Sequence, residues 1–571
     1  MNKLFDKLLD TVGNWNPQLF RELKGRFTRR NVAIAVGASL LTQILLIFSY
    51  LGGLPEPRQD KYDRFSRYCT GTPDDYMHSS RQCFVDALGI DWQINWQLWH
   101  LDLFVGLSII SVGLLLIISS HLINADLTKE EKRGTLGFVR LSPQSAQRII
   151  LGKILGVPSL IYLGVGLALP LHFFLGLQAN ISPAWIAMFD LVAIAASATC
   201  FSVAVLWSFI GRDFFAGFQP WIYSGGLGFY LAMMTVLGLE NDFPADNSFD
   251  WLRMIYPGNI FYYIMSRSSL PTETINYFEP SNWFGTQFYH STHWGLRGLI
   301  SIFGHYALIT FVAWLGIGRR FYDPQKTVIS KKTAYGITIF STIFMTGFAC
   351  STDEAYRISD NFGVLQVFYF ALIISLTLLL TPTRQQVQDW SRFRHQGKFA
   401  RQLWADLLWG DRSPALGAIA VMIISSTGIM AIVAATNPFL EDKSTILVSL
   451  VLQAGTLFML AALIQFIFLN KKQRGVWLVV TLSSLTIVPF ILAAMFSDRF
   501  VGAIALGLFS AFPTIVVDRA FSELIFFAIA GQWLGIVGSV IVLRKRIRRL
   551  GDSEVKTLLQ SPAESPENML T

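Results

Sequence analysis

The feature that most constrains this chain is a series of apolar stretches, each near the roughly 20 residues that an α-helix needs to cross a bilayer. Clear examples are Val32 to Gly53, Ala184 to Ile210 and Thr445 to Leu469. Unpaired backbone amides are too costly in hydrocarbon, so such runs predict membrane-spanning helices. The composition agrees, since 52% of the 571 residues are hydrophobic and 15% are charged, against about 25% charged residues in soluble domains. We therefore expect an all-α integral membrane protein.

The apolar runs predict about twelve spans in two halves of about six each. The first half is expected at 32–318 and the second at 333–549, with a cytoplasmic linker at 319–332. The other predicted spans of the first half are Leu101 to Asn124, Ile149 to Leu175, Ala216 to Leu239 and Gly298 to Gly318. Those of the second half are Thr333 to Cys350, Gly363 to Leu380, Ala415 to Thr436, Gly475 to Met495 and Leu524 to Leu543.

Basic residues cluster at the ends of these runs. The net charge of +8 would suit nucleic acid in a soluble protein, but basic flanks of apolar runs are retained in the cytoplasm and set topology. Arg29 and Arg30 precede the first run, and Arg544 to Arg549 follow the last. We therefore expect both termini in the cytoplasm and no nucleic-acid partner. The polar tail at 550–571 is expected to be disordered.

The run Val501 to Val517 does not fit a simple alternation of spans. If it crossed the membrane, the basic cluster at Arg544 to Arg549 would end outside. We therefore expect a re-entrant or interfacial element there, broken at Pro513, because irregular backbone is tolerated at membrane depth when protein surrounds it.

The N-terminal segment, residues 1–31, predicts an amphipathic helix on the inner membrane surface. Asn16 and Pro17 suit a helix start, because Asn can cap and Pro fits the first turn. The apolar residues after this start share one helical face: Leu19, Phe20, Leu23 and Phe27. The alternative is that this segment forms the first turns of the first span.

The charged segment at 125–148, between the second and third predicted spans, contains several helix signals. Thr128 and Glu131 have the spacing of a capping box, which predicts that a short helix begins there. Gly134 can end that helix in the left-handed conformation. Ser142 and Pro143 predict the start of the next helix. Such a segment, held by two spans, could act as a lever that another protein moves.

This segment resembles the loop between the second and third spans of permeases in the type-2 ABC exporter class. The matching residues are Glu130-Glu131, Arg133, Gly134-Thr135-Leu136, Ser142-Pro143 and Gly152-Lys153. The resemblance implies a coupling helix in a cleft of a separate ATPase subunit, with the coupling residues Thr128, Glu130, Glu131, Arg133, Gly134, Thr135 and Leu136. An ordinary amphipathic loop is the alternative.

The resemblance has further implications. ATP and magnesium would bind to the ATPase subunit, and the chain would act in a bacterial cytoplasmic membrane, where a second permease copy is possible. A re-entrant hairpin is expected before the last span of each half, at Trp251 to Met265 and at Val501 to Val517. The expected function is transport, with export implied by the family.

Other chemistry is not indicated by the sequence. No phosphate-binding loop of the Gly-x-x-x-x-Gly-Lys-Ser/Thr type occurs, so we expect no enzyme and no cofactor on this chain. No Cys/His cluster has zinc spacing, and the pair His290 and His293 is more typical of a solvated loop than of a metal site.

Three ionisable residues, His172, Asp190 and His305, fall within predicted spans. Such groups are functional candidates by default. They lie far apart in the sequence, so we expect no proton relay, and an interhelical hydrogen bond is an equally good interpretation. An ion-coupled secondary transporter is the second functional hypothesis; it would favour paired carboxylates or broken helices at the midplane, and the sequence shows no such pair. A non-transporting subunit or assembly factor is the third.

Two cysteines lie in the loop at 54–99, which the basic N-terminus places outside the cytoplasm. Because that compartment is oxidising, we expect a disulfide between Cys69 and Cys83. Cys350 is a possible rival partner, but it is distant in the sequence. Cys200 falls within a span.

Overall fold

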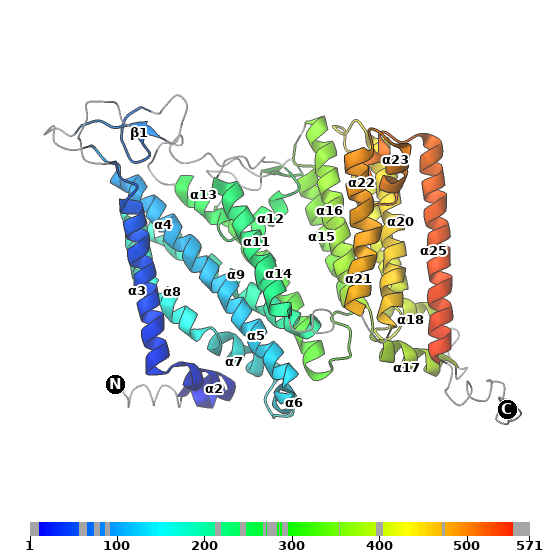
Figure 1. The fold of residues 1–571 in the computed structure, drawn as a ribbon, viewed down its shortest axis with the longest axis horizontal. Helices are drawn as coiled ribbons and strands as arrows, with labels where there is room; N and C mark the ends of the chain where they lie inside the picture. Colours follow the sequence, from blue (N-terminus) through cyan, green and yellow to red (C-terminus); the bar gives the residue numbers. More distant parts are fainter. Residues whose placement is uncertain are drawn as a thin grey trace, which may run out of the picture. The chain divides into compact units, whose positions relative to one another are not determined.

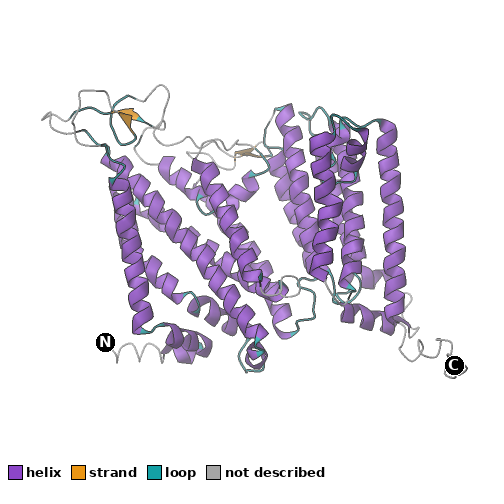
Figure 2. Cartoon of the chain, in the orientation of Figure 1, coloured by secondary structure: helices purple, strands orange, loops and turns teal. Residues whose placement is uncertain are grey.

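The structure, a computed structural model, describes residues 11–55, 65–72, 80–85, 92–211, 218–239, 247–266, 270, 282–284, 286–287, 295–352, 354–395, 403–470 and 474–551. This part of the chain is almost wholly helical (Figure 2). The chain divides into two compact units. Unit 1 comprises Met1–Asn282 and Thr286–Tyr322, and unit 2 comprises Trp283–Gly285 and Asp323–Thr571. The division after Tyr322 falls inside the linker expected at 319–332.

Within the described residues, ten helices are long and apolar enough to cross a membrane. In unit 1 these are Arg29–Leu51, Trp96–Lys132, Ser159–Gln178, Pro183–Ile210 and Gly298–Tyr322. In unit 2 they are Tyr356–Leu380, Leu416–Thr436, Lys443–Phe468, Arg474–Phe496 and Ser522–Gly551. The protein is therefore an all-α, multi-pass membrane protein. Two more helices, α11 (Gln219–Leu239) and α15 (Lys331–Ala349), overlap the spans expected at 216–239 and 333–350 but are not among the ten.

Unit 1 contains a bundle of tilted helices (Figure 1). Its elements are α2 (Pro17–Arg26), α3 (Arg29–Leu51), β1 (Phe65–Ser66), β2 (Arg81–Gln82), α4 (Trp96–Gly113), the π-helical turn η1 (Leu114–Ile118), α5 (Ser119–Lys132), α6 (Thr135–Arg140), α7 (Ala146–Gly156), α8 (Ser159–Gln178), α9 (Pro183–Ile210), α11, α12 (Asp250–Ile255), α13 (Asn259–Ser266) and α14 (Gly295–Tyr322). Helices α2, α6 and α7 lie at one end of this unit and β1 lies at the other (Figure 1). A further pair of two-residue strands is formed by β3 (Asn282–Trp283) and β4 (Thr286–Gln287).

The N-terminal helix α2 begins where the sequence predicts. The Asn16 side chain accepts a hydrogen bond from Leu19 N at 3.1 Å, and Pro17 occupies the first turn. A separate cap at Thr28 starts α3, so α2 is not the first turn of the first span. The buried face of α2 differs from the apolar face expected from the sequence, because it includes Gln18 and Glu22 beside Leu19. This face packs against α7, which supplies a basic partner for Glu22.

The capping box predicted at Thr128 and Glu131 is not formed. Helix runs without a gap through α4, η1 and α5, from Trp96 to Lys132, so Thr128 lies inside a helix and cannot adopt the extended conformation of a cap. Its hydroxyl instead donates to Asn124 Oδ1 at 3.2 Å. The physical reason is that Ser119–Lys132 contains neither proline nor glycine, so nothing stops the helix before the cap signal.

The predicted helix start at Ser142 and Pro143 is also wrong. Helix α7 begins at Ala146, and its cap is Ser145, whose side chain accepts from Arg148 N at 3.4 Å. The span expected at Ile149 to Leu175 is then two helices, because α7 ends at Gly156 and α8 begins after Pro158. Proline lacks the amide proton that would continue α7.

Unit 2 is a second helical bundle. Its elements are α15, α16 (Ala355–Leu380), α17 (Arg384–His395), α18 (Leu403–Trp409), α19 (Leu416–Thr436), α20 (Lys443–Phe468), α21 (Arg474–Leu482), the π-helical turn η3 (Ser483–Ile487), α22 (Val488–Phe496), α23 (Val501–Leu508), α24 (Thr514–Val517) and α25 (Ser522–Gly551). Helices α17 and α18 lie at one end of this unit and α23 lies at the other (Figure 1). Helix α25 includes the basic cluster that was expected to follow the last span.

Each unit contains a pair of helices too short to cross a bilayer. In unit 1, α12 and α13 have 6 and 8 residues; in unit 2, α23 and α24 have 8 and 4. Eight residues of helix extend only about 12 Å. These pairs coincide with the segments expected to be re-entrant, at Trp251 to Met265 and at Val501 to Val517.

Side chains from neighbouring helices bond the carbonyls at the ends of these short helices. In unit 1, the hydroxyls of Tyr230 and Tyr306 donate to Leu252 O at 2.8 Å and Ile255 O at 2.6 Å. In unit 2, the amides of Gln453 and Gln532 donate to Ala511 O at 2.9 Å and Leu508 O at 3.3 Å. Irregular backbone can thus be buried without leaving these acceptors unpaired.

Candidate functional site

The segment between α5 and α6 forms an exposed turn at one end of unit 1. Gly134 ends α5 with φ of +72°, the left-handed conformation that the sequence predicts and that a side chain would disfavour. Helix α6 follows, and the Thr135 hydroxyl donates back to Glu130 O at 3.1 Å. Leu136 is buried and holds α6 against the unit. On the outer side, Phe138 is 78% exposed and Leu141 is 85% exposed, so two large apolar side chains face outward.

Behind this turn, the Lys153 side chain of α7 has no exposed surface. Its ammonium lies 2.6 Å from Asp126 Oδ2, 2.9 Å from Glu130 Oε1 and 3.1 Å from Glu22 Oε1. These carboxylates come from α5 and α2, so a single cation joins three helices. We call Lys153, Asp126, Glu130 and Glu22 the Lys153 cluster.

Two arginines extend the Lys153 cluster toward solvent. Arg21 Nη2 donates to Glu130 Oε1 at 2.7 Å, and Arg26 Nη2 donates to Asp126 Oδ1 at 3.3 Å. The three carboxylates could in principle hold a metal ion, since their oxygens lie within 4.8 Å of one another. The Lys153 ammonium contacts all three carboxylates, and together with the guanidinium groups of Arg21 and Arg26 it balances their three negative charges, so the arrangement fits an ion-pair network.

The electrostatics of the Lys153 cluster favour the charged forms. Burial raises the pKa of Glu22, but the charge and hydrogen bond of Lys153, with the charges of Arg26 and Arg21, outweigh it and leave that pKa lowered. Burial likewise lowers the pKa of Lys153, but Asp126, Glu22 and Glu130 together leave it raised. Both shifts keep the pair of Glu22 and Lys153 charged at neutral pH.

Two glycines allow α2 to approach α7 closely enough for these contacts. A Cβ at Gly152 would lie 2.8 Å from Leu19 N, and one at Gly156 would lie 2.5 Å from Glu22 Cβ. The spacing of four residues places both glycines on one face of α7. Asn16 adds a direct bond, because its amide donates to Arg148 O at 2.7 Å.

The exposed turn also contacts the last helix of the unit. Arg140 lies 3.8 Å from Glu131 Oε1 and 5.7 Å from the centre of the Phe321 ring. The Tyr322 hydroxyl accepts a hydrogen bond from Ala146 N at 2.9 Å. The turn is thus connected to α14 as well as to α2 and α7.

The predicted coupling residues divide into two groups in the structure. Arg133 and Thr135 are exposed at the turn, with Gly134 between them. Thr128, Glu130, Glu131 and Leu136 face inward: Thr128 and Leu136 are buried, Glu130 belongs to the Lys153 cluster, and Glu131 is beside Arg140. Glu130 and Glu131 therefore do not lie free in water, because cations of the same unit hold them.

Sequence reasoning missed the acidic partners Glu22 and Asp126 and the exposed Phe138 and Leu141. One sequence pattern did indicate a paired acidic site: Asp126 and Glu130 are four residues apart and therefore share a helical face. The Gly152-Lys153 pair was noted only as part of a motif. The partnership with Glu22, 131 residues away, has no local signal.

Of the three ionisable residues predicted within spans, His172 and Asp190 lie close together in the structure. His172 Nδ1 lies 3.8 Å from Asp190 Oδ1, and His172 Nε2 lies 2.7 Å from Ser108 Oγ. His305 lies apart from them, with Nδ1 2.8 Å from Ser301 O on its own helix. The pair His290 and His293 lies outside the described residues.

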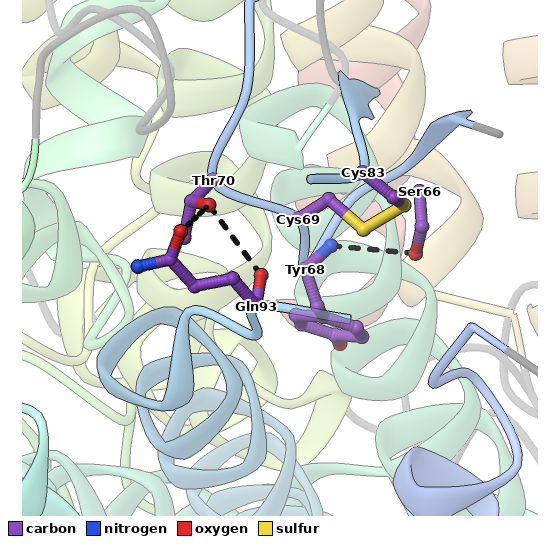
Figure 3. The surroundings of a disulfide bond; sticks show 6 residues. All are labelled: Ser66, Tyr68, Cys69, Thr70, Cys83 and Gln93. Atoms are coloured by element: carbon purple, nitrogen blue, oxygen red, sulfur yellow. Dashed lines mark hydrogen bonds between the residues drawn. A yellow bond between two sulfur atoms is a disulfide. The ribbon is translucent and has the colours of Figure 1, made fainter. Parts of the chain in front are cut away.

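At the opposite end of unit 1, a disulfide joins Cys69 and Cys83 (Figure 3). The described part of this loop is also tied to α4, since Arg67 Nε lies 2.6 Å from Asp102 Oδ2 and Asn95 N donates to Tyr68 O at 2.8 Å. The free cysteines are Cys200 and Cys350. The disulfide therefore braces a loop, and no Cys-x-x-Cys spacing in the sequence indicates redox exchange.

Unit 2 also has a buried lysine at one end, with different partners. The Lys331 side chain lies at the start of α15 and is almost completely buried. Its ammonium donates to Leu407 O and Ser413 Oγ, each at 2.7 Å, near the end of α18. Carbonyl acceptors at a helix C-terminus, where the dipole is negative, thus replace the carboxylates of unit 1.

Comparison with known proteins gives no assignment: no family model, no curated protein and no solved structure matches this chain.

Proposed function

We propose that this chain is the membrane-spanning permease of an ATP-binding cassette transporter, moving its substrate with ATP that a separate subunit hydrolyses. The observation that carries the proposal is the braced turn of unit 1, where α6 presents Phe138 and Leu141 outward while the Lys153 cluster fixes the same segment from behind. Exposed apolar side chains at a polar end of a membrane protein suit burial in a partner. A rigid support lets that partner transmit force.

The path for force begins at α6. Helix α5 continues through η1 and α4 without a gap, so movement at Gly134 is carried along one helix toward Trp96. The Lys153 cluster and the contacts of Arg140 and Tyr322 pass the same movement to α2, α7 and α14. A partner that grips α6 would therefore move several helices of unit 1 together.

This geometry changes the roles proposed for the coupling residues. Arg133, Phe138 and Leu141 form the surface that docks on the ATPase. Gly134 sets the direction of α6, and Thr135 and Leu136 stabilise the turn. Glu130 and Glu131 position the surface from behind through Lys153 and Arg140.

The proposal includes a topology. Counting α11 and α15 with the ten apolar helices gives twelve spans, and the short pairs α12–α13 and α23–α24 are re-entrant. Both termini then lie in the cytoplasm, with the Cys69–Cys83 loop outside. The chain belongs in a bacterial cytoplasmic membrane, either alone or with a second permease copy, and the direction implied by the family is export.

The decisive experiment is affinity purification of the full chain in mild detergent, followed by mass spectrometry. We expect an ATPase with a phosphate-binding loop to copurify with the wild type and to be lost with the double variant Phe138→Glu and Leu141→Glu. The matched control is Tyr356→Glu, which also changes an aromatic side chain that is 65% exposed. An ATPase retained equally by the double variant, or absent from the wild type, contradicts the proposal.

One observation favours a second candidate, an ion-coupled secondary transporter. The sequence offered no pair of ionisable groups within the membrane, but His172 and Asp190 form one. In that case transport by the purified chain in liposomes would follow a proton gradient without any ATPase. A non-transporting subunit predicts neither ATPase copurification nor gradient-driven transport.

A further inference from the structure

His172 of α8 lies in an aromatic enclosure between α4 and α9. Its ring stacks on Phe104 at 4.3 Å between centroids and lies 5.5 Å from the Phe189 ring. Only 4% of the residue is exposed. On one side Nε2 faces the buried Ser108, and on the other Nδ1 faces the partly exposed carboxylate of Asp190.

The hydrogen bonds of Ser108 determine which imidazole nitrogen carries a proton. The Ser108 hydroxyl has one proton, and its Oγ lies 2.6 Å from Phe104 O, which can only accept. The hydroxyl therefore donates to that carbonyl, and His172 Nε2 must donate to Ser108 Oγ. In a neutral imidazole, Nδ1 then carries only a lone pair.

This assignment leaves two acceptors facing each other. His172 Nδ1 is buried and has no hydrogen-bond partner, and Asp190 Oδ1 lies 3.8 Å away. A neutral histidine beside an ionised aspartate would thus leave two lone pairs opposed, with an uncompensated negative charge. One added proton supplies the missing donor, whether it rests on Nδ1 or on the carboxyl.

The position in the helix makes this charge costly. Asp190 is the eighth residue of α9, about 10 Å along the axis from the first. A carboxylate at such depth in a span is expensive unless it is paired or protonated. The protonated pair has no net charge in either arrangement, so it is the form whose burial costs least.

No other charge in the described part of unit 1 compensates the pair. The remaining ionisable side chains on elements packed against α8 are Arg21, Glu22, Lys24 and Arg26 of α2, Arg29, Arg30 and Tyr50 of α3, His100 and Asp102 of α4, and Cys200 of α9. On the elements packed against α9, the described ones are His121, Asp126, Lys129, Glu130, Glu131 and Lys132 of α5, Tyr223 and Tyr230 of α11, and His305, Tyr306, Arg319, Arg320 and Tyr322 of α14. Asp102 is paired with Arg67, and His100 bonds Trp96 O. None of these groups forms a bond with His172 or Asp190 among the described residues.

We propose that His172 and Asp190 form a proton-binding site within unit 1, in which one proton taken from water bridges Nδ1 and the carboxylate while Ser108 fixes the opposite nitrogen. The partly exposed carboxylate is the entry point, and the buried imidazole is the inner acceptor. Proton binding joins α8 to α9, because it converts a repulsive contact between these helices into a hydrogen bond. The site stands on its own geometry and does not depend on an ATPase partner.

The order Ser108, His172, Asp190 also resembles the arrangement of a hydrolase triad, but the chemistry does not fit. Ser108 has no exposed surface, and its hydroxyl proton is committed to Phe104 O. A nucleophile must reach its substrate and pass its proton to the imidazole. Proton binding needs neither.

The test uses the full chain in lipid nanodiscs, with infrared difference spectra recorded between about pH 5 and 9, the range in which histidine charge changes are usual. The wild type should show a component from a protonated carboxyl or an imidazolium. This component should be lost in Asp190→Asn and in His172→Gln. The control His305→Gln, which removes another buried intramembrane imidazole, should keep it.

The same variants also include controls for correct folding. The side-chain amide introduced by Asp190→Asn can donate permanently to Nδ1 of His172, so this variant should fold with a pH-independent contact. Ser108→Ala should keep the component but shift its midpoint, because the tautomer is no longer fixed. Identical difference spectra in the wild type, Asp190→Asn and His172→Gln would overturn the proposal.

Discussion

Lys153 shows how one residue can support a whole surface. A fully buried ammonium is costly to desolvate, and its three carboxylate partners would repel one another without it. The buried ammonium needs the carboxylates and the carboxylates need the ammonium, so the ion pairs hold α2, α5 and α7 in fixed positions. The Lys153 cluster also makes the exposed turn at α6 rigid, because Glu130 lies one helical turn before Gly134.

The first prediction is that Lys153→Met strongly destabilises unit 1. Methionine keeps the aliphatic length but leaves Glu22, Asp126 and Glu130 without their cation. Breaking a buried pair in this way typically costs about 3–5 kcal/mol. We expect a lower melting temperature of the detergent-purified protein and faster proteolysis between α2 and α3.

Lys129→Met is the matched control, since Lys129 is exposed on α5 near the same cluster. Its melting temperature should stay within about a degree of the wild type, because surface substitutions usually change stability by less than about 0.5 kcal/mol. Equal stability of the two variants would show that the Lys153 cluster does not brace the turn.

At the scale of elements, the two units use different residues to hydrogen-bond the carbonyls at the ends of their short helices. The short pairs α12–α13 and α23–α24 both leave helix-end carbonyls within a bundle, and tyrosines bond them in unit 1 where glutamines do so in unit 2. The two lysines at the ends of the units likewise bind carboxylates in one case and carbonyls in the other. The two units thus have similar short helices and buried lysines, but because different residues bond them, the similarity is not visible as a repeat in the sequence.

The second prediction concerns the pair α23–α24. Gln453 Nε2 donates to Gln366 O and Ala511 O, so Gln453→Leu leaves the Ala511 carbonyl unpaired inside the bundle. A lost polar contact of this kind costs about 1–2 kcal/mol in a membrane bundle. We expect Ser510→Cys, placed in the turn between the two helices, to react with a polar thiol reagent only in the Gln453→Leu background.

Cys200 and Cys350 must first be replaced by alanine, so that the reagent reports the new thiol alone. The control is Val451→Leu, a change of similar size on the exposed face of the same helix. If Ser510→Cys is equally unreactive in both backgrounds, Gln453 is not what holds the turn.

The sequence predicted elements whose signals are local. Asn16 with Pro17, Gly134 and most span boundaries depend on neighbouring residues alone, and α9 begins within a residue of its expected start. Two predicted helix starts were wrong. At Thr128 the preceding helix continues through the cap signal, and at Ser142 the helix begins later, with Ser145 as its cap. The Lys153 cluster and the contact between His172 and Asp190 join residues far apart in the chain, so only the packed structure reveals them.

At the scale of the whole molecule, the path of the chain depends on α23 and α24. Ten helices are long enough to cross a membrane within the described residues, and α11 and α15 are the further spans we propose. The apolar run at 501–517 is long enough to span if it were one helix, but Pro513 and the turn before it divide it. In the topology we propose, its two helices are confined to one side of the membrane, and α25 crosses in the same direction as α20.

The last prediction tests this path with topology reporters. A reporter fused after Gly551 should be cytoplasmic, because α25 ends in basic residues that resist export. Reporters at Asn282, between α13 and α14, and at Asn437, between α19 and α20, should be extracytoplasmic. The Asn437 reporter precedes the short pair in the chain, so it keeps its location whichever way that pair runs. An extracytoplasmic signal after Gly551 together with an unchanged signal at Asn437 would mean that α23 and α24 cross the membrane, and the re-entrant assignment would fail.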